Sequence, residues 1–370
     1  MLAPLLLALA CTSTPPPDGR GGDTPTTPRS TGDTGPTTDT TSQSTPTADT
    51  SSTATTGTTG FTAETGGTAT TGSTGATADT APPPFDCATV PEYAGPEVML
   101  TAPRGYNDVV FDLDGAMIGS NETALIRATD EVTASVWVPG IGRGYKMGLL
   151  PDGDVVFALS ASEGGGVLRI NAQGGQTLLG SGLLTHGMEV GPDGEVYAAT
   201  NYTAGAAAIF KVPVDGSTPV LLVDASFAEP RDIAFSRDYS RLYWGTLNGG
   251  TIWAVSLDKN MNVVGYPEQV AQVPEGWHDT LEVNACGNLY VGSVFQSGIY
   301  RVKTDGTVQL YLDWSFNDYG HGLRWGVARG GWDEQSIYIT HPYVGSLVSK
   351  VYVGVPGAHW PGEVIGEVTL

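Results

Sequence analysis

Polar side chains with the chemistry of active sites recur at one position in each of six repeated segments of the chain. The residues at this position are Asn107, Tyr145, His186, Arg231, Asp279 and His321. Four further polar residues lie directly beside them, namely Asp108, Lys146, Asp232 and His278. Imidazoles, carboxylates, a guanidinium and a phenol gathered at one place could bind a metal ion, transfer protons or hold a ligand.

One interpretation of these residues is a metal site. His186 and His321, with Asp279 or His278 as the third ligand, could hold zinc and leave one coordination position open for water. Calcium would instead require a shell of oxygen ligands. The sequence thus leaves two possibilities for a cofactor: one divalent metal, either zinc or calcium, or none.

A metal at this place would indicate a hydrolase or lyase. In such an enzyme Arg231 would hold a carboxylate of the substrate, because a guanidinium can donate two parallel hydrogen bonds to it. Either Asp279 or Tyr145 would then transfer the proton. These three residues are the catalytic candidates.

The leading interpretation is instead a binding module without catalysis, in which the polar residues hydrogen-bond to one another and to water, and the metal-dependent hydrolase or lyase is the alternative to it. Buried polar groups without partners would be costly, so such pairing is expected in any case. The ligand would be a small molecule, a glycan or another protein, and its contacts would come from Asn107, Asp232, His278 and Trp277. Aromatic residues that could grip a sugar or peptide, or simply pack between elements, are Trp277, Trp314, Tyr319 and Trp325.

The segments that carry the polar residues share one pattern, which indicates how they are positioned. Each begins with an apolar strand, turns at an Asp- or Gly-rich corner and enters a second strand that ends in Ser or Thr. The second strands are expected at 117–120, 157–160, 197–200, 243–246, 290–293 and 338–340. A period of roughly 40–48 residues is typical of four-stranded propeller blades. The sequence thus predicts an all-β fold, a six-bladed β-propeller of four-stranded antiparallel blades over residues 85–370.

A closed ring is expected, because an open array of sheets would expose two long edges. Segment 97–100 looks like the fourth strand of a blade that lacks its first three strands, so we expect it to complete blade six. Segment 363–370 is the alternative for this role. In a closed propeller the first strand of each blade lines the central channel, which would bring the six repeated polar residues to one channel mouth.

The blade pattern resembles that of the gluconolactonase-like and NHL-repeat propellers. The resemblance rests on segments 186–194 and 279–283, and on 290–293 running into 299–302, and it covers about 99–353. It implies a divalent cation held by one Glu, by Asn residues and by an Asp that also serves as the base. Asp279 matches that Asp, whereas Asn107 stands at the Glu position, and His186 and Arg231 stand at Asn positions.

The resemblance extends to lyases on NHL-type propellers, in which histidines hold zinc beside an Arg and a Tyr. On this pattern His186 and His321 would be zinc ligands. Arg231 and Tyr145 would take the roles of the neighbouring Arg and Tyr.

The N-terminus is similar to a bacterial lipoprotein signal. An apolar run follows Met1 and ends in Ala8-Leu9-Ala10-Cys11, which fits a lipobox with Cys11 as the acylated residue. Residues 12–84 are rich in Thr, Gly, Ser and Pro and cannot bury enough apolar surface to fold, so a disordered linker is expected. The protein is therefore expected to be anchored by lipid in the cell envelope, in the outer membrane or on a periplasmic or extracellular face.

The net charge bears on possible partners, and the cysteines bear on a possible disulfide. The chain has 17 Lys and Arg against 39 Asp and Glu, a net charge of −22 that repels phosphate backbones. Nucleic acid is therefore excluded as a partner, and a monomer is expected. Cys87 and Cys286 could form a disulfide in an oxidising compartment or remain separate thiols, and the sequence leaves both open.

Overall fold

The computed structural model describes residues 85–200, 207–247, 249–274, 276, 278–293, 298–314 and 320–359. The predictions for the signal 1–11 with Cys11, the linker 12–84, Trp277, Tyr319 and segment 363–370 lie outside these residues. The described ranges contain two short 3-10 helices, η1 (Cys87–Thr89) and η2 (Ala161–Glu163). None of their helices has the length and hydropathy needed to span a membrane.

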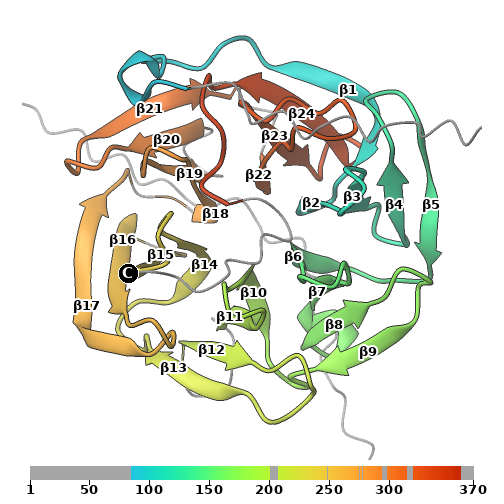
Figure 1. The fold of residues 1–370 in the computed structure, drawn as a ribbon, viewed down its shortest axis with the longest axis horizontal. Coiled ribbons are helices and arrows are strands. Elements are labelled where there is room, and N and C mark those ends of the chain that lie inside the picture. The colour runs from blue at the N-terminus through green and yellow to red at the C-terminus, as the bar shows by residue number, and fades with distance from the viewer. Residues whose placement is uncertain are drawn as a thin grey trace, which may run out of the picture. The chain divides into compact units, whose positions relative to one another are not determined.

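Six antiparallel sheets of four strands surround a central axis, which confirms the predicted six-bladed β-propeller (Figure 1). Blade one consists of β2 (Val109–Phe111), β3 (Met117–Ser120), β4 (Ala124–Ala128) and β5 (Ala134–Pro139). Blade two consists of β6 (Gly144–Leu149), β7 (Val155–Leu159), β8 (Val167–Ile170) and β9 (Gln176–Leu179). Blade three consists of β10 (Thr185–Val190), β11 (Val196–Thr200), β12 (Ala208–Val212) and β13 (Val220–Asp224).

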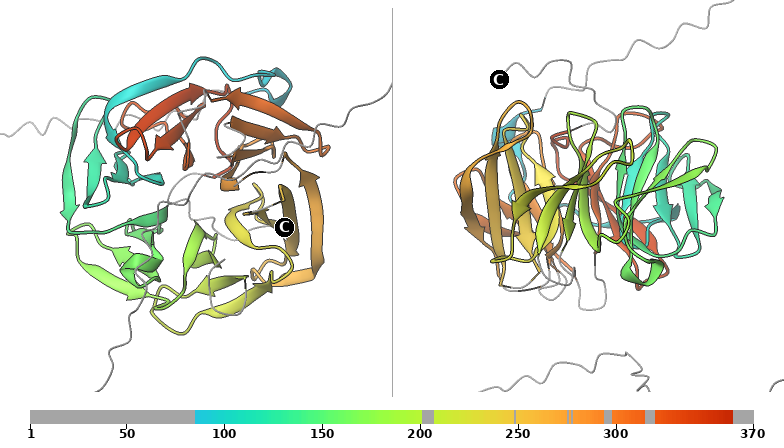
Figure 2. Two further views of the ribbon diagram at one scale, coloured as in Figure 1. Left: turned by 180° about the vertical axis from the view of Figure 1, so that it is seen from behind. Right: turned by 90° about the horizontal axis from the view of Figure 1, so that it is seen from below.

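The remaining blades follow the same order along the chain. Blade four consists of β14 (Pro230–Phe235), β15 (Arg241–Thr246), β16 (Thr251–Leu257) and β17 (Val263–Gln272). Blade five consists of β18 (His278–Val283), β19 (Leu289–Ser293), β20 (Gly298–Val302) and β21 (Val308–Asp313). Blade six consists of β22 (Leu323–Trp325), β23 (Ser336–His341), β24 (Leu347–Tyr352) and β1 (Val98–Arg104). The first strand of each blade lies nearest the axis, and the sheets stand side by side around it (Figure 2).

The ring is closed by β1, as the sequence predicted for segment 97–100. This strand pairs antiparallel with β24, with Val98 opposite Lys350. A clasp of Glu97, His341 and Ser349 holds the junction. Ser349 Oγ donates to Glu97 Oε1 at 2.5 Å, and His341 Nε2 lies 2.8 Å from Ser349 Oγ and 3.0 Å from Glu97 Oε1.

Aromatic pairs fill the seams between blades. The recurring tyrosine of the second strand is fully buried in blades three, five and six, where it meets an aromatic residue at the end of the next blade's inner strand. The pairs are Tyr197–Phe235, Tyr290–Trp325 and Tyr338–Phe111, with ring centroids 5.1, 5.5 and 5.6 Å apart. Edge-to-face pairs of this kind stabilise a fold by roughly 0.5–1.5 kcal/mol beyond the area they bury.

Two of the aromatic residues considered for ligand contact are part of this packing. Trp325 is 6% exposed and Trp314 is 3% exposed, and both lie in one core cluster of blades five and six. Both residues therefore pack between blades, which is the other role that the sequence allowed, and neither is exposed at the channel mouth.

Cys87 and Cys286 form a disulfide, with Cα atoms 5.6 Å apart. The bond ties the segment before β1 to the turn between β18 and β19. Of the two possibilities that the sequence left open, the structure has the paired form.

Candidate functional site

The inner strands bring the six repeated polar residues, called the ring residues below, to one end of the axis. Each lies at or just before the start of β2, β6, β10, β14, β18 or β22. We call this the ring end. Ring residues of neighbouring blades contact one another. Residues that the sequence repeat placed at equivalent positions are therefore close together in the folded protein.

Arg231, Asp279 and His321 form a buried cluster across three neighbouring blades. Arg231 Nε donates to Asp279 Oδ1 at 2.6 Å, and His321 Nδ1 lies 3.3 Å from Asp279 Oδ2. Arg231 is 7% exposed and Asp279 is 5% exposed. Burial alone would raise the pKa of Asp279, but the Arg231 guanidinium and the imidazoles of His321 and His186 lower it to about 2. Asp279 is therefore a fixed anion held by a guanidinium.

His186 extends the cluster toward blade two. Its Nδ1 lies 3.2 Å from the backbone oxygen of Arg231, and its ring stacks on Tyr145 with centroids 4.2 Å apart. Burial and the Arg231 guanidinium hold the pKa of His186 well below its ordinary value. Burial also lowers the pKa of His321, although Asp279 opposes this. Both imidazoles are thus neutral near pH 7, each with one donor and one acceptor nitrogen.

The other predicted ligand contacts lie beside this cluster rather than within it. Asn107 Nδ2 donates to the backbone oxygen of Gly144 at 2.7 Å, which links blade one to blade two. His278 is buried, and its Nε2 lies 3.2 Å from the backbone oxygen of Pro274. Asp232 lies one residue further along β14 and belongs to a deeper layer.

This deeper layer is an ion-pair network about the axis. Lys146 Nζ lies 2.9 Å from Asp232 Oδ2, 3.6 Å from Glu282 Oε1 and 4.0 Å from Asp108 Oδ2. Asp232 Oδ2 also accepts from the backbone N–H of Leu281 at 2.8 Å, and Asp108 Oδ2 accepts from that of Met147 at 3.0 Å. The two aspartates thus join neighbouring blades as well as binding Lys146.

The sequence analysis missed three members of the network: Glu189, Glu282 and Arg324. Arg324 Nη1 lies 3.0 Å from both Glu189 Oε2 and Glu282 Oε1. Glu189, Glu282 and Arg324 occupy equivalent positions in blades three, five and six. In each blade this position lies two residues after the one equivalent to Asp232. Since alternate residues of a strand share a face, a period of two along the inner strands was the signal that could have identified them.

An exposed aromatic residue beside the ring was also missed. Tyr343 is 66% exposed, and its ring packs edge-to-face on His321 at 5.4 Å. It lies in the turn after β23, outside the inner strands from which the ring was predicted, and no feature of the repeat identifies it.

The donor set at the ring end suits polar recognition better than a metal. In the described part of the chain, no group of three or more His, Cys, Asp or Glu residues is placed to hold a metal ion. One oxygen of Asp279 already accepts from Arg231, and that guanidinium would repel a cation bound to Asp279. The residues present therefore do not fit the calcium or zinc site that the sequence suggested.

Comparisons with known proteins identify the fold. No family model and no curated protein sequence matches the chain, whereas many solved structures do. A gluconolactonase of Xanthomonas campestris is 17% identical with a TM-score of 0.54, covering 71% of this chain and 98% of that one. A regucalcin of Agrobacterium tumefaciens, described as calcium-binding, is 17% identical with a TM-score of 0.55, covering 70% and 95%.

A third similar structure is described as an auxiliary nutrient binding protein of Bacteroides ovatus. It is 12% identical with a TM-score of 0.55, and the match covers 69% of this chain and 72% of that one. At such identities the similarity establishes the fold alone. The chain shares the six-bladed β-propeller fold of the gluconolactonase- and regucalcin-like proteins.

Proposed function

We propose that this protein is a lipid-anchored propeller of the cell envelope that binds a small hydroxylated molecule, such as a saccharide, at the ring end. The cluster of Arg231, Asp279, His321 and His186 carries this proposal. It offers a fixed cation, a fixed anion and two neutral imidazoles within one buried group. A ligand with several hydroxyl groups can donate to and accept from such a set.

Aromatic residues on two sides of the cluster support a saccharide-like ligand. Tyr145 stacks on His186, and the exposed Tyr343 packs against His321. Aromatic faces commonly supply the apolar contacts in a polar binding site. The similar fold of an auxiliary nutrient binding protein agrees with this proposal.

A thermal-shift screen of monosaccharides, oligosaccharides and sugar acids with the purified full-length protein tests the proposal. A ligand should raise the melting temperature, and His186→Ala should abolish that shift. His359→Ala is a matched control, because His359 lies at the opposite end of the axis. A shift that survives in His186→Ala, or no shift with any compound, would contradict the proposal.

The second candidate is a hydrolase or lyase, favoured by the contact of His321 with Asp279. His321 Nδ1 lies 3.3 Å from Asp279 Oδ2, and a hydrogen bond formed between them on substrate binding would leave Nε2 as the basic nitrogen, which is the arrangement of a general base. Turnover of lactones that is lost in Asp279→Asn would support it. Elemental analysis with and without His186→Ala/His321→Ala would show whether a metal takes part, since only a metal lost in the double variant belongs to this site.

The proposed anchor rests on Cys11 and the apolar residues before it. Expressed in a bacterium that acylates lipoproteins, the wild-type protein should partition into the detergent phase of a Triton X-114 extraction. Cys11→Ser should move it to the aqueous phase, because two or more acyl chains are what hold a lipoprotein stably in a membrane. Equal partitioning of both proteins would contradict the anchor while leaving the ring-end proposal intact.

A further inference from the structure

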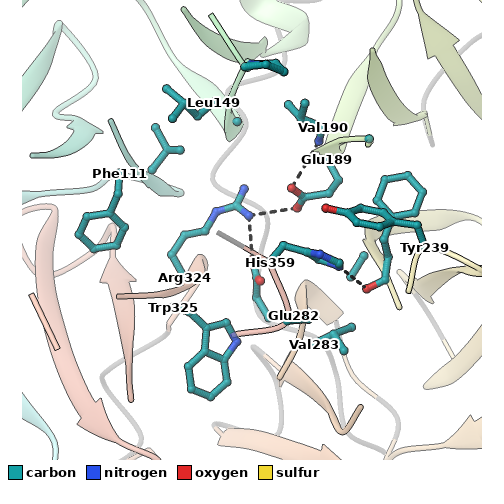
Figure 3. A pocket seen from close by; sticks show the side chains of 17 residues that line it. Phe111, Leu149, Glu189, Val190, Tyr239, Glu282, Val283, Arg324, Trp325 and His359 are labelled. Carbon is teal, nitrogen blue, oxygen red and sulfur yellow. Dashed lines mark hydrogen bonds and ion pairs between the residues drawn. The ribbon is translucent and has the colours of Figure 1, made fainter. Parts of the chain in front are cut away.

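A second polar site lies at the opposite end of the axis, where the inner strands finish. A cavity of about 80 Å³ is found there (Figure 3). Most of the residues that line it are apolar, but polar atoms make up about half of the lining surface, and its charged lining residues are Glu189, Glu282 and Arg324. None of the predicted ring residues lines it.

Residues 353–359, which follow β24, form a strap over this end of the axis. Ala358 N–H donates to the backbone oxygen of Val283 at 2.9 Å, and the ring of His359 packs on Tyr239 with centroids 4.1 Å apart. Both Ala358 and His359 line the cavity. A side chain at Gly357 would come within 2.6 Å of the Trp325 ring, so glycine permits the close approach of the strap. The strap is therefore held by defined contacts with blades four, five and six, and all six blades contribute residues to the cavity below it.

Arg324 has no donor left for a ligand. Its Nε donates to the backbone oxygen of Val109 at 3.2 Å, and Nη2 binds Asp108 Oδ2 and the backbone oxygen of Met147. Nη1 lies between Glu189 and Glu282, at 3.0 Å from each (Figure 3). Since a guanidinium has donors only, a fully engaged Arg324 cannot recognise an anion in the cavity.

The carboxylates, by contrast, have unused acceptor capacity. Glu282 is 8% exposed, and among the described residues its Oε1 has ion-pair contacts with Lys146 and Arg324 but accepts no hydrogen bond. In the whole buried network, four carboxylates face two cations. The carboxylates are Asp108, Asp232, Glu189 and Glu282, and the cations are Lys146 and Arg324. Burial raises the pKa of Glu282 to about 8 despite the nearby Arg324 and Lys146, so its ionised form would be stabilised by a further cation or hydrogen-bond donor beside it.

We propose that this cavity binds a small organic ammonium ion, with its N–H donors toward Glu282 and Glu189. Its short hydrocarbon part would pack on the apolar walls, among them Val110, Leu149 and Val283. An engineered cavity of about 150 Å³ accepts benzene, so a space of this size suits an ammonium group with only a few carbons. The apolar walls favour an organic cation over a metal ion, which needs several polar ligands.

Titration calorimetry of the full-length protein with n-propylammonium tests the proposal, with 1-propanol as the neutral probe of similar size. Binding with a dissociation constant below about 10 mM is expected. Propanol should bind at least about tenfold more weakly, because it lacks the charge that a buried carboxylate attracts. Glu282→Gln should weaken propylammonium binding by about tenfold or more for the same reason.

Two further variants keep the outcome clear. Glu189→Gln, which changes a less buried carboxylate, should also weaken propylammonium binding. If Glu282→Gln does not fold, Glu189→Gln serves as the test in its place. His186→Ala should leave propylammonium binding unchanged, which separates this site from the ring end. No saturable binding, equal binding of propanol, or affinity unchanged in both glutamate variants would overturn the proposal.

Discussion

At the scale of single residues, the ring end depends on one buried ion pair. Arg231 and Asp279 are each more than nine-tenths buried, and each neutralises the other at 2.6 Å. Removing one partner of such a pair leaves an uncompensated charge in a poorly solvated place, which commonly costs about 3–5 kcal/mol. The same pairing keeps Asp279 ionised and Arg231 fixed in place, so stability and recognition rest on the same two side chains.

Asp279→Asn should therefore lower the free energy of unfolding by about 3–5 kcal/mol, because it leaves the Arg231 guanidinium buried without a counter-ion. Urea denaturation of both proteins measures the difference. Asp313→Asn, on an exposed side chain, is the control and should change stability by less than about 0.5 kcal/mol. Equal stability of Asp279→Asn and wild type would show that the pair does not hold the ring end.

The pH dependence follows from the same residue. The folded-state pKa of Asp279 is lowered from 3.8 to about 2. Its contribution is therefore fully present above pH 3.8 and is lost as the pH falls toward 2, with a size on the order of 2 kcal/mol. The neutral histidines His186 and His321, whose pKa values are lowered, should also cost stability as the pH falls below 6.5. Acid titration of unfolding should show a shallower loss at low pH in Asp279→Asn.

At this scale the sequence predicted that the six ring residues lie close together, but it did not predict which of them form ion pairs or hydrogen bonds with one another. Asn107, Tyr145, His186, Arg231, Asp279 and His321 were found because they recur at one place in a repeat. Whether Asp279 binds a metal or a guanidinium depends on distances of a few ångströms across blades, which spacing along the chain does not contain. Glu282 and Arg324 were missed because the prediction considered only the aligned ring position and its direct neighbours, whereas these two residues lie further along the inner strands.

At the scale of elements, the strands themselves were predictable because the Asp and Gly turns and the tyrosine of the second strand repeat. The role of β1 was predictable as well, since an open ring would leave an unpaired edge. The clasp that secures β1 was not, because Glu97 is far in sequence from His341 and Ser349, and the three residues belong to no repeat.

Glu97→Gln should lower the free energy of unfolding by roughly 1–3 kcal/mol, because it removes the charge that His341 and Ser349 contact at a half-buried site. Glu92→Gln, at an exposed residue before β1, should leave stability nearly unchanged. Hydrogen exchange would locate the effect, with faster exchange expected in β1 and β24. An equal loss of protection in all blades would argue against a local role of the clasp.

At the scale of the whole molecule, closure is reinforced by a covalent bond. The disulfide of Cys87 with Cys286 spans 199 residues and ties the segment before β1 to blade five. The sequence left this pairing open, because two cysteines so far apart meet only through the folded ring.

Cys87→Ala/Cys286→Ala should cost roughly 2–5 kcal/mol of stability, mainly because the unfolded chain regains the freedom of a long loop. Denaturation of the double variant, compared with wild type under oxidising and reducing conditions, measures this. Wild type under reducing conditions should approach the double variant, whereas the double variant should not respond to reductant. No difference between oxidised wild type and the double variant would show that closure rests on β1 alone.

The central claim is that ligand binds at the ring end, and the five histidines of the chain report on it directly. Nitrogen-15 spectra of histidine-labelled protein, recorded with the saccharide from the thermal-shift screen, separate the two ends of the axis. The account predicts that the ring signals of His186 and His321 shift on binding, while that of His359, at the opposite end, stays in place. Shifts confined to His359, or no shift of His186 and His321 at saturation, would contradict it.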